Sequence, residues 1–211
     1  MITRNDLDAL RLKVSSLLSQ GRMKHTLEVE KMALSIGCIF FRDDEDVLLY
    51  LRAAALLHDV TKELSDDDQL RLLEAYSVKP LPEELDSMPT IHALTASLVI
   101  PDRFPEFADA RVIDAVRYHT TGREGMSTFE KIIFLADYID ETRTYPSCIA
   151  LREEFFAANP EAMENDARIR HLDSAALRSI DNTMSYLHSK ERSIHPLTLS
   201  AREDLIRRLE E

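Results

Sequence analysis

Hydrophobic side chains recur every three to four positions through most of this chain, and this spacing is typical of amphipathic helices. One hydrophobic stripe covers 7–18 and a second covers 24–36. Gly21 and Gly37 follow these stripes, and glycine commonly lies just after the last turn of a helix, so we predict that both helices end there. A third helix is predicted over 43–57, because acidic residues precede its apolar face.

Capping residues and prolines indicate the bounds of the later helices. Ser65 before three aspartates, and Ser127 with Glu130, are typical of capping boxes that start a helix. Proline interrupts or opens a helix, so we predict that Pro101 closes one helix and Pro105 opens the next. The later predicted helices are one that follows Ser65, then 91–100, 105–116 and 128–140, and three more after 147, the last introduced by Pro196. No repeat or linker interrupts this pattern, so we predict a single all-α domain over residues 1–211.

The composition narrows the classes of function. The 211 residues include 26 Lys and Arg and 38 Asp and Glu, a formal net charge of −12, which argues against a nucleic-acid polymer as partner. Four glycines are too few and too scattered for a dinucleotide-binding or Walker phosphate loop. No segment has the pattern of a membrane span or a leader peptide. Two isolated cysteines, Cys38 and Cys148, are typical of reduced thiols, so we expect a cytoplasmic protein. Because no membrane span is predicted, we also expect no membrane partner.

Six histidines and aspartates occupy positions where the helical pattern requires apolar residues. His25, for example, shares a helix face with Val29, Met32 and Ile36. Burying an ionised carboxylate without a cation costs of order tens of kcal/mol on an idealised estimate. Any one of the six is compatible with a structural role in a core. Their coincidence on five helices favours a site where the helices converge and a metal ion neutralises the carboxylates. The six are His25, His58, Asp59, His92, His119 and Asp137.

Four of these residues follow the signature of a known superfamily. A first histidine, an adjacent His-Asp pair and a distant aspartate, here His25, His58-Asp59 and Asp137, resemble the HD superfamily of metal-dependent phosphohydrolases. Longer segments resemble one branch, the YqeK family of HD-type symmetrical diadenosine tetraphosphatases. These segments are 56–62 (LLHDVTK), 118–126 (YHTTGREGM), 136–139 (ADYI) and 194–198 (IHPLT).

The resemblance implies a fold, a metal and a set of site residues. The fold is an HD-domain helical bundle, with a catalytic core over about 22–145 and additional C-terminal helices over about 147–211. Mixed imidazole and carboxylate ligands suit a divalent transition metal, and among Fe, Mn, Co, Ni and Zn we expect Fe, as one ion or two. The implied metal ligands are His25, His58, Asp59 and Asp137, with His92 and His119 either holding a second ion or donating to phosphate. The implied catalytic residues are Asp59, Lys62, His92 and His119, and the implied substrate contacts are His25, Asp59, Lys62, His92, His119, Thr120, Asp137 and Arg143.

The implied reaction is attack of water on an internal phosphate of diadenosine tetraphosphate, which releases two molecules of ADP. The partners are then a nucleotide substrate and an ADP-like product, and a homodimer stays open. Two alternatives also stay open: another HD-type nucleotide phosphohydrolase, such as a nucleotidase or an alarmone hydrolase, and a non-catalytic metal-containing module that senses a nucleotide. Two positions depart from the family pattern. Ala93 stands where glycine is frequent, and Asp140-Glu141 stands where a Glu-Pro pair is commoner.

Overall fold

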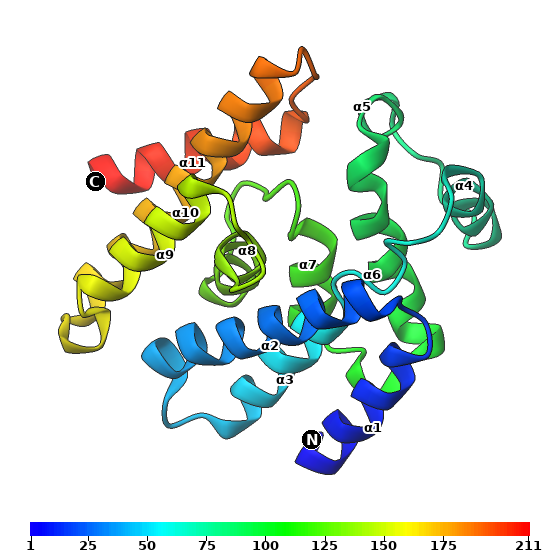
Figure 1. Ribbon diagram of the computed structural model, residues 1–211, viewed down its shortest axis with the longest axis horizontal. Coiled ribbons are helices and arrows are strands. Elements are labelled where there is room, and N and C mark those ends of the chain that lie inside the picture. The colour runs from blue at the N-terminus through cyan, green and yellow to red at the C-terminus, as the bar shows by residue number, and fades with distance from the viewer.

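The chain folds entirely into helices, as the sequence predicts (Figure 1). The computed structural model describes residues 1–211, with eleven α-helices, three short 3-10 helices and no strand. The α-helices are α1 (Arg4–Ser15), α2 (Gln20–Phe41), α3 (Glu45–Leu57), α4 (Asp66–Ala75), α5 (Pro82–Asp86), α6 (Ile91–Arg103), α7 (Ala110–Tyr118), α8 (Thr128–Ile139), α9 (Pro146–Ala157), α10 (Asn165–Ser189) and α11 (Pro196–Glu210). None of them combines the length and the hydrophobicity needed to cross a membrane.

The centre of the molecule is built from α2, α3, α7 and α8. α2 packs along α3 and against α8, and α7 contacts α3, α6 and α8. One continuous cluster of buried hydrophobic residues joins these helices, with Leu56 and Ile132 fully buried in it. A smaller cluster, which includes Phe134, Ile180 and Leu205, attaches α10 and α11 to α8. Figure 1 shows α9, α10 and α11 together on one side of α8, and α4 and α5 on the far side of the molecule.

The two helix ends predicted at glycines are wrong. α1 already ends at Ser15, so Gly21 lies in the first turn of α2, and α2 continues past Gly37 to Phe41. A Cβ atom added to Gly37 would lie 2.8 Å from Cδ1 of Leu51, so this glycine allows α2 and α3 to approach closely. Neither glycine has the left-handed backbone of a helix stop. Gly37 therefore reflects helix packing rather than chain reversal.

The prolines mark helix ends less sharply than predicted. α6 continues through Pro101 to its end at Arg103, because a proline removes only one hydrogen bond from a helix that is about to end. Pro105 opens a 3-10 turn instead of the next α-helix. α7 begins later, where the side chain of Asp109 accepts a hydrogen bond from the backbone amide of Arg111 at 2.9 Å. A capping side chain, and not the proline, therefore sets the start of α7.

One of the two predicted capping boxes is complete. The hydroxyl of Ser127 accepts from the amide of Glu130 at 3.2 Å, and the Glu130 carboxylate accepts from the amide of Ser127 at 2.9 Å. Ser65 makes only the first of these two bonds, because its hydroxyl rather than its amide donates to the Asp68 carboxylate. The box at Ser127 fixes the start of α8, the helix that carries Asp137.

Candidate metal centre

The six histidines and aspartates predicted from the helix faces surround one point in the molecule. Nε2 of His25 lies 3.0 Å from Oδ1 of Asp137, although the two residues are far apart in the sequence. All of the six except Asp137 are buried, and that carboxylate is partly exposed. His25 comes from α2, His58 and Asp59 from the end of α3, His92 from the first turn of α6, His119 from the end of α7 and Asp137 from α8.

Two of the histidines are oriented by the ends of their own helices. The last carbonyl groups of a helix have no partner within it. Nδ1 of His58 lies 2.6 Å from the carbonyl oxygen of Ala55, and Nδ1 of His119 lies 2.7 Å from that of Val116. A carbonyl oxygen only accepts, so Nδ1 carries the proton in each neutral ring. The lone pair on Nε2 then points to the centre of the site.

The other two histidines have different supports. Nδ1 of His25 lies 3.1 Å from the hydroxyl of Thr142 and 3.3 Å from Oδ2 of Asp140. The Thr142 hydroxyl in turn donates to Oδ1 of Asp140, so it accepts from His25. Nδ1 of His92 lies 3.0 Å both from the carbonyl of Pro89, which only accepts, and from the ammonium of Lys62, which only donates. His92 therefore finds a partner in either tautomer.

Asp59 lies between two pairs of histidines. Its Oδ2 is 3.3 Å from Nε2 of His58 and 3.8 Å from Nε2 of His25. Its Oδ1 is 3.1 Å from Nε2 of His92 and 3.7 Å from Nε2 of His119. Each oxygen thus faces its own pair of imidazole nitrogens, so this carboxylate could serve two ions.

The donor atoms fit a metal ion. Nε2 of His25 and Nε2 of His58 are buried without a hydrogen-bond partner, which is costly unless something else binds them. Ligand atoms of His25, His58 and Asp59 lie within 4.8 Å of one another, and so do those of Asp59, His92 and His119. Mixed imidazole and carboxylate donors are those that a divalent transition metal takes. The chain could therefore hold one or two such ions here.

The charges of the site favour a cation. Burial by itself raises the pKa of Asp59, but the three nearest histidines hold it well below its usual range. Burial likewise raises the pKa of Asp137, and the guanidinium of Arg143 and the ring of His25 more than offset this effect. Burial lowers the pKa of His25, whereas Asp137 and Asp140 raise it, and the result is about 9. Both carboxylates are therefore ionised at neutral pH, and a metal ion at His25 would displace a proton.

Three contributing residues were not among the predicted site residues. Arg22 donates from Nη1 to Oδ2 of Asp59 at 2.8 Å. Asp140 is fully buried and, together with Thr142, supports His25. Arg22 precedes His25 by three positions, so helical spacing places it on the same side of α2. The signal was present, but an arginine at a helix start is usually solvated.

The residues predicted to contact phosphate lie next to this centre. Lys62 donates to the carbonyl of Pro89 at 3.1 Å, and burial lowers the pKa of its ammonium. Arg143 pairs with the Asp137 carboxylate, and its Nε donates to the Asp137 carbonyl at 2.8 Å. The hydroxyl of Thr120 is buried and has no partner. The structure thus places all three beside the six donors, and their roles stay predictions.

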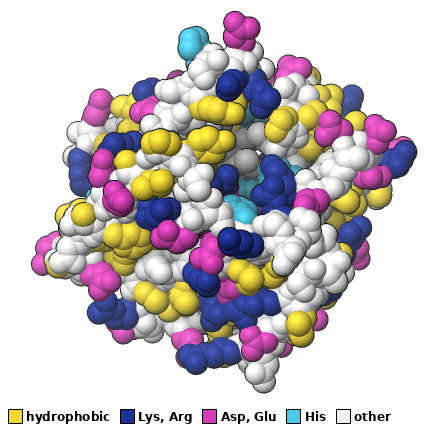
Figure 2. All heavy atoms as spheres, viewed as in Figure 1, with side chains coloured by type: hydrophobic (Ala, Val, Ile, Leu, Met, Phe, Trp, Pro, Cys, Tyr) yellow, Lys and Arg dark blue, Asp and Glu magenta, His cyan; other side chains and the backbone are white.

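Two clefts adjoin the centre, and Arg143 and Tyr145 line both of them. One has a volume of 370 Å³ and includes His119, Thr120 and Asp137 in its lining. The other has a volume of 480 Å³ and includes Arg22 and His25. Figure 2 shows a hollow near the middle of this face, with histidine and Lys or Arg side chains gathered in it. The donor cluster is therefore open to a ligand from outside.

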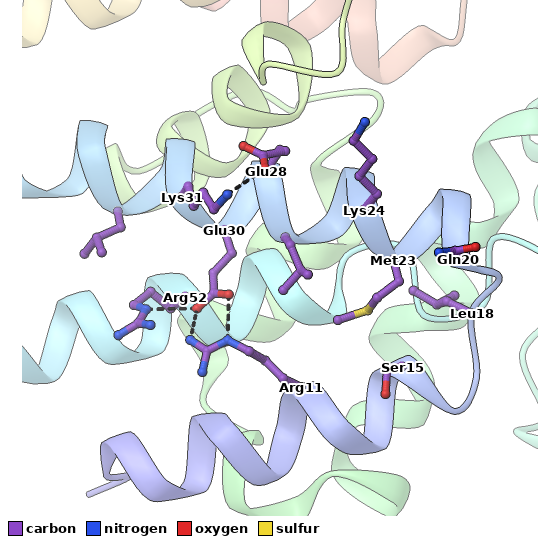
Figure 3. A pocket seen from close by; sticks show the side chains of 12 residues that line it. Arg11, Ser15, Leu18, Gln20, Met23, Lys24, Glu28, Glu30, Lys31 and Arg52 are labelled. Carbon is purple, nitrogen blue, oxygen red and sulfur yellow. Dashed lines mark hydrogen bonds and ion pairs between the residues drawn. The ribbon is translucent and has the colours of Figure 1, made fainter.

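A further cavity, of 720 Å³, lies apart from the centre, between α1, α2 and α3 (Figure 3). The carboxylate of Glu30 is buried there and pairs with Arg11 of α1 and Arg52 of α3. Figure 3 shows both guanidinium groups turned toward this carboxylate. None of the six donor residues lines this cavity, and its ion cluster ties the three helices together.

Comparison with known proteins identifies the family. The model of the HD domain matches residues 22–142, which is more than half of the chain. The chain belongs to the HD-domain family. All six donors fall within the matched segment, so the predicted membership in this family is confirmed. The all-α fold expected of an HD domain is confirmed as well.

Relatives of this HD-domain protein extend over nearly its whole length. A protein of Halalkalibacterium halodurans named symmetrical bis(5'-nucleosyl)-tetraphosphatase is 31% identical over 200 residues, which cover 94% of this chain and 95% of the relative. A Bacillus subtilis protein of the same name is 29% identical over 185 residues, 88% and 89% of the two chains. A crystal structure from Clostridium acetobutylicum, described as a predicted HD superfamily hydrolase involved in NAD metabolism, has a TM-score of 0.80 at 28% identity and covers 95% of this chain and 97% of its own.

Proposed function

We propose that this HD-domain protein hydrolyses diadenosine tetraphosphate symmetrically to two molecules of ADP, with a divalent transition metal at the HD centre. The two named relatives support the substrate and the position of cleavage, because they match this chain over most of its length. The single observation that carries the proposal is the surroundings of Asp59. Each of its oxygens faces two buried imidazole nitrogens, an arrangement with no evident structural purpose and a clear use in binding metal.

The proposed ligands follow from the distances in the centre. One ion would be held by His25, His58, Asp59 and Asp137, whose imidazole nitrogens and carboxylate oxygens face one another, and a second by Asp59, His92 and His119. We expect iron ahead of Mn, Co, Ni and Zn. Mg and Ca do not suit this donor set, because they prefer oxygen ligands. When bound, such ions lower the pKa of a coordinated water and withdraw charge from a phosphoryl oxygen.

The chain's own cations provide the phosphate contacts in this proposal. The protein has a formal charge of −12 and the substrate is anionic, so local cations must reverse the sign of the field inside the cleft. Arg143 lines both clefts and offers a fork suited to two phosphate oxygens. Lys62 adds a second cation beside His92. The unpartnered hydroxyl of Thr120 can donate to a phosphate oxygen.

His92 and His119 complete the proposed catalytic group. Burial lowers the pKa of His92 to about 4, so its ring is neutral at physiological pH. When Lys62 donates to Nδ1 of His92, the ring proton sits on Nε2, which faces the centre and can be donated to a phosphate oxygen. With one ion His92 can thus donate a proton to phosphate, whereas with two ions its Nε2 would be a ligand and would carry no proton.

Hydrolysis of a substrate panel tests this proposal. Purified protein would be incubated with diadenosine tetraphosphate and Fe, Mn, Co, Ni or Zn in turn, and the nucleotides separated by chromatography. We expect ADP as the only product, and none from Asp59→Ala, with Asp67→Ala, an exposed carboxylate on α4, as the active control. ATP together with AMP would contradict symmetrical cleavage. Turnover of guanosine tetraphosphate or nucleoside monophosphates alone would favour the other HD-type hydrolases.

Three further predictions concern the whole protein and stay predictions. We expect it in the cytoplasm, as one domain over 1–211 with its catalytic core over about 22–145 and the C-terminal helices over about 147–211. We expect no nucleic-acid polymer or membrane among its partners. A homodimer is compatible with this proposal but not required by it, because the chain supplies all six donors itself.

A further inference from the structure

The cleft of 370 Å³ extends from the metal centre to helices that lie outside the HD-domain match. His119, Asp137 and Arg143 form its inner end, while its outer part is lined from α9 and α10. Its volume falls within the range of about 300–1,000 Å³ usual for small-molecule sites. We propose that this outer part is a nucleoside pocket, in which Asn182 contacts the edge of an adenine base and Tyr145 and Tyr186 cover its face. This inference rests on the proposed function, since it names the residues that would select the nucleoside.

Aromatic side chains line the outer cleft. Phe134 is almost fully buried, and Tyr138 is half-buried. Tyr145 and Tyr186 are 62% and 49% exposed, which is unusual for two tyrosines whose ring centroids lie only 6.5 Å apart. A flat aromatic ligand would remove these faces from water. Stacking on aromatic side chains is a common means of binding a nucleobase.

Polar groups accompany the rings where a nucleoside needs them. Asn182, on α10, offers a donor and an acceptor on one amide, the pair that matches the N6 and N7 edge of adenine. The Thr183 hydroxyl donates to the carbonyl of Ser179 at 2.8 Å, so it can accept from a ribose hydroxyl. Thr120, with its unpartnered hydroxyl, lies in the same lining nearer the centre. The lining therefore changes from aromatic and amide groups to phosphate-binding groups toward Asp137.

The second cleft has a polar lining, and this difference sets the direction of the substrate. Its lining contains the cations Arg22, Lys24 and Arg143 beside the carboxylates of Glu63 and Glu141, and Tyr145, which both clefts share, is its only tyrosine or phenylalanine. Cations without an apolar wall suit phosphates rather than a base. One adenosine of the substrate thus occupies the tyrosine-lined pocket, the phosphates cross Arg143, and the other half follows the cationic cleft. Only one of the two nucleosides is selected by shape.

Binding of ADP and of inorganic pyrophosphate separates the nucleoside pocket from the phosphate contacts. Both ligands would be titrated calorimetrically into metal-loaded protein, as wild type, Tyr186→Ala, Asn182→Ala and the control His188→Ala, an exposed position on α10. We expect Tyr186→Ala and Asn182→Ala each to weaken the binding of ADP by about 5- to 150-fold, the equivalent of ~1–3 kcal/mol for a stacked or paired base. Pyrophosphate binding should change by less than about twofold, the equivalent of ~0.4 kcal/mol. The Asn182→Ala change should weaken the binding of GDP less than that of ADP, because guanine lacks the N6 donor.

The outcomes distinguish this inference from the proposed function. Unchanged ADP binding in both variants, or equal losses for ADP and pyrophosphate, would overturn the nucleoside pocket. The same variants should raise KM for diadenosine tetraphosphate with little change in kcat, because neither residue touches the reacting phosphorus. Absence of hydrolysis by the wild type would refute the proposed function alone, since the comparison of ADP with pyrophosphate needs no turnover. Circular dichroism checks that the variants keep their helices, and Tyr186 is exposed enough for its removal to be tolerated.

Discussion

Replacing Asp140 by asparagine tests whether this carboxylate prepares His25 for a metal. Oδ2 of Asp140 lies 3.3 Å from Nδ1 of His25, and Oδ1 accepts from the amide of Thr142 at 2.8 Å. Asparagine keeps the shape and an acceptor for Thr142 but removes the charge. The side chain is fully buried, so solvent does not screen the interaction that is lost.

The expected loss is about tenfold in metal affinity. Oδ2 of Asp140 faces Nδ1 of His25 without a hydrogen bond, so the interaction that is lost is that of a buried charge with the ring. Loss of a group that supports a metal-bound histidine costs about 10- to 100-fold in metal affinity, and asparagine keeps the shape, so we expect the lower end of this range. Tenfold corresponds to about 1.4 kcal/mol.

Competition with a chelator of known affinity measures this loss directly. Asp140→Asn and the control Glu141→Gln would be titrated with Mn or Zn against the chelator. Glu141 is an exposed carboxylate that pairs with Arg152, so its change should leave the metal affinity as it is. Activity of Asp140→Asn should return when the metal is raised to saturation. An unchanged metal affinity, or a loss of kcat that saturating metal does not restore, would refute the role given to Asp140.

Three more changes test other parts of the account. Asp59→Ala should abolish hydrolysis and metal binding while the helical circular dichroism spectrum persists, because it removes the carboxylate shared by both histidine pairs; turnover near that of the wild type would contradict this. Arg143→Ala should lower kcat/KM by about tenfold to a thousandfold, the equivalent of one or two charge-assisted bonds to phosphate, and the protein should keep its metal. If the variant loses the metal, Arg143 instead supports the Asp137 carboxylate. Gly37→Ala should lower the free energy of unfolding in urea by about 1–2 kcal/mol, because overpacking against Leu51 exceeds the gain in helix propensity. The control Gly21→Ala should not lower it, because no atom lies within 4 Å of the new methyl group.

The helices and the six buried donor residues were predictable because both depend on local spacing. A residue such as His25 repeats the phase of the apolar residues around it, so its position on the buried face can be read from the sequence. The expense of burying Asp59 and Asp137 then required a cation near them. The structure brings these residues together as expected, with Nε2 of His25 3.0 Å from Asp137.

Features that depend on contacts between distant helices were not predictable. Gly37 looks like a helix stop in the sequence, and only the approach of Leu51 from α3 gives it another purpose. Asp140 follows the predicted ligand Asp137 by three positions, yet nothing local shows that it reaches His25. Thr120, which follows α7, and Asn182, on α10, line the same cleft of 370 Å³. No pattern in either segment of the sequence indicates that the two residues lie together.

Anomalous diffraction from a crystal of the metal-loaded protein shows whether the six donor residues bind the ion. We expect an anomalous peak at about 2.0–2.2 Å from Nε2 of His25, Nε2 of His58 and the carboxylates of Asp59 and Asp137, the length of ligand bonds to a metal of this class. A second peak between Asp59, His92 and His119 would show that two ions bind. No peak among these side chains, in a protein that is active and loaded with metal, would contradict the assignment of this site as the metal centre.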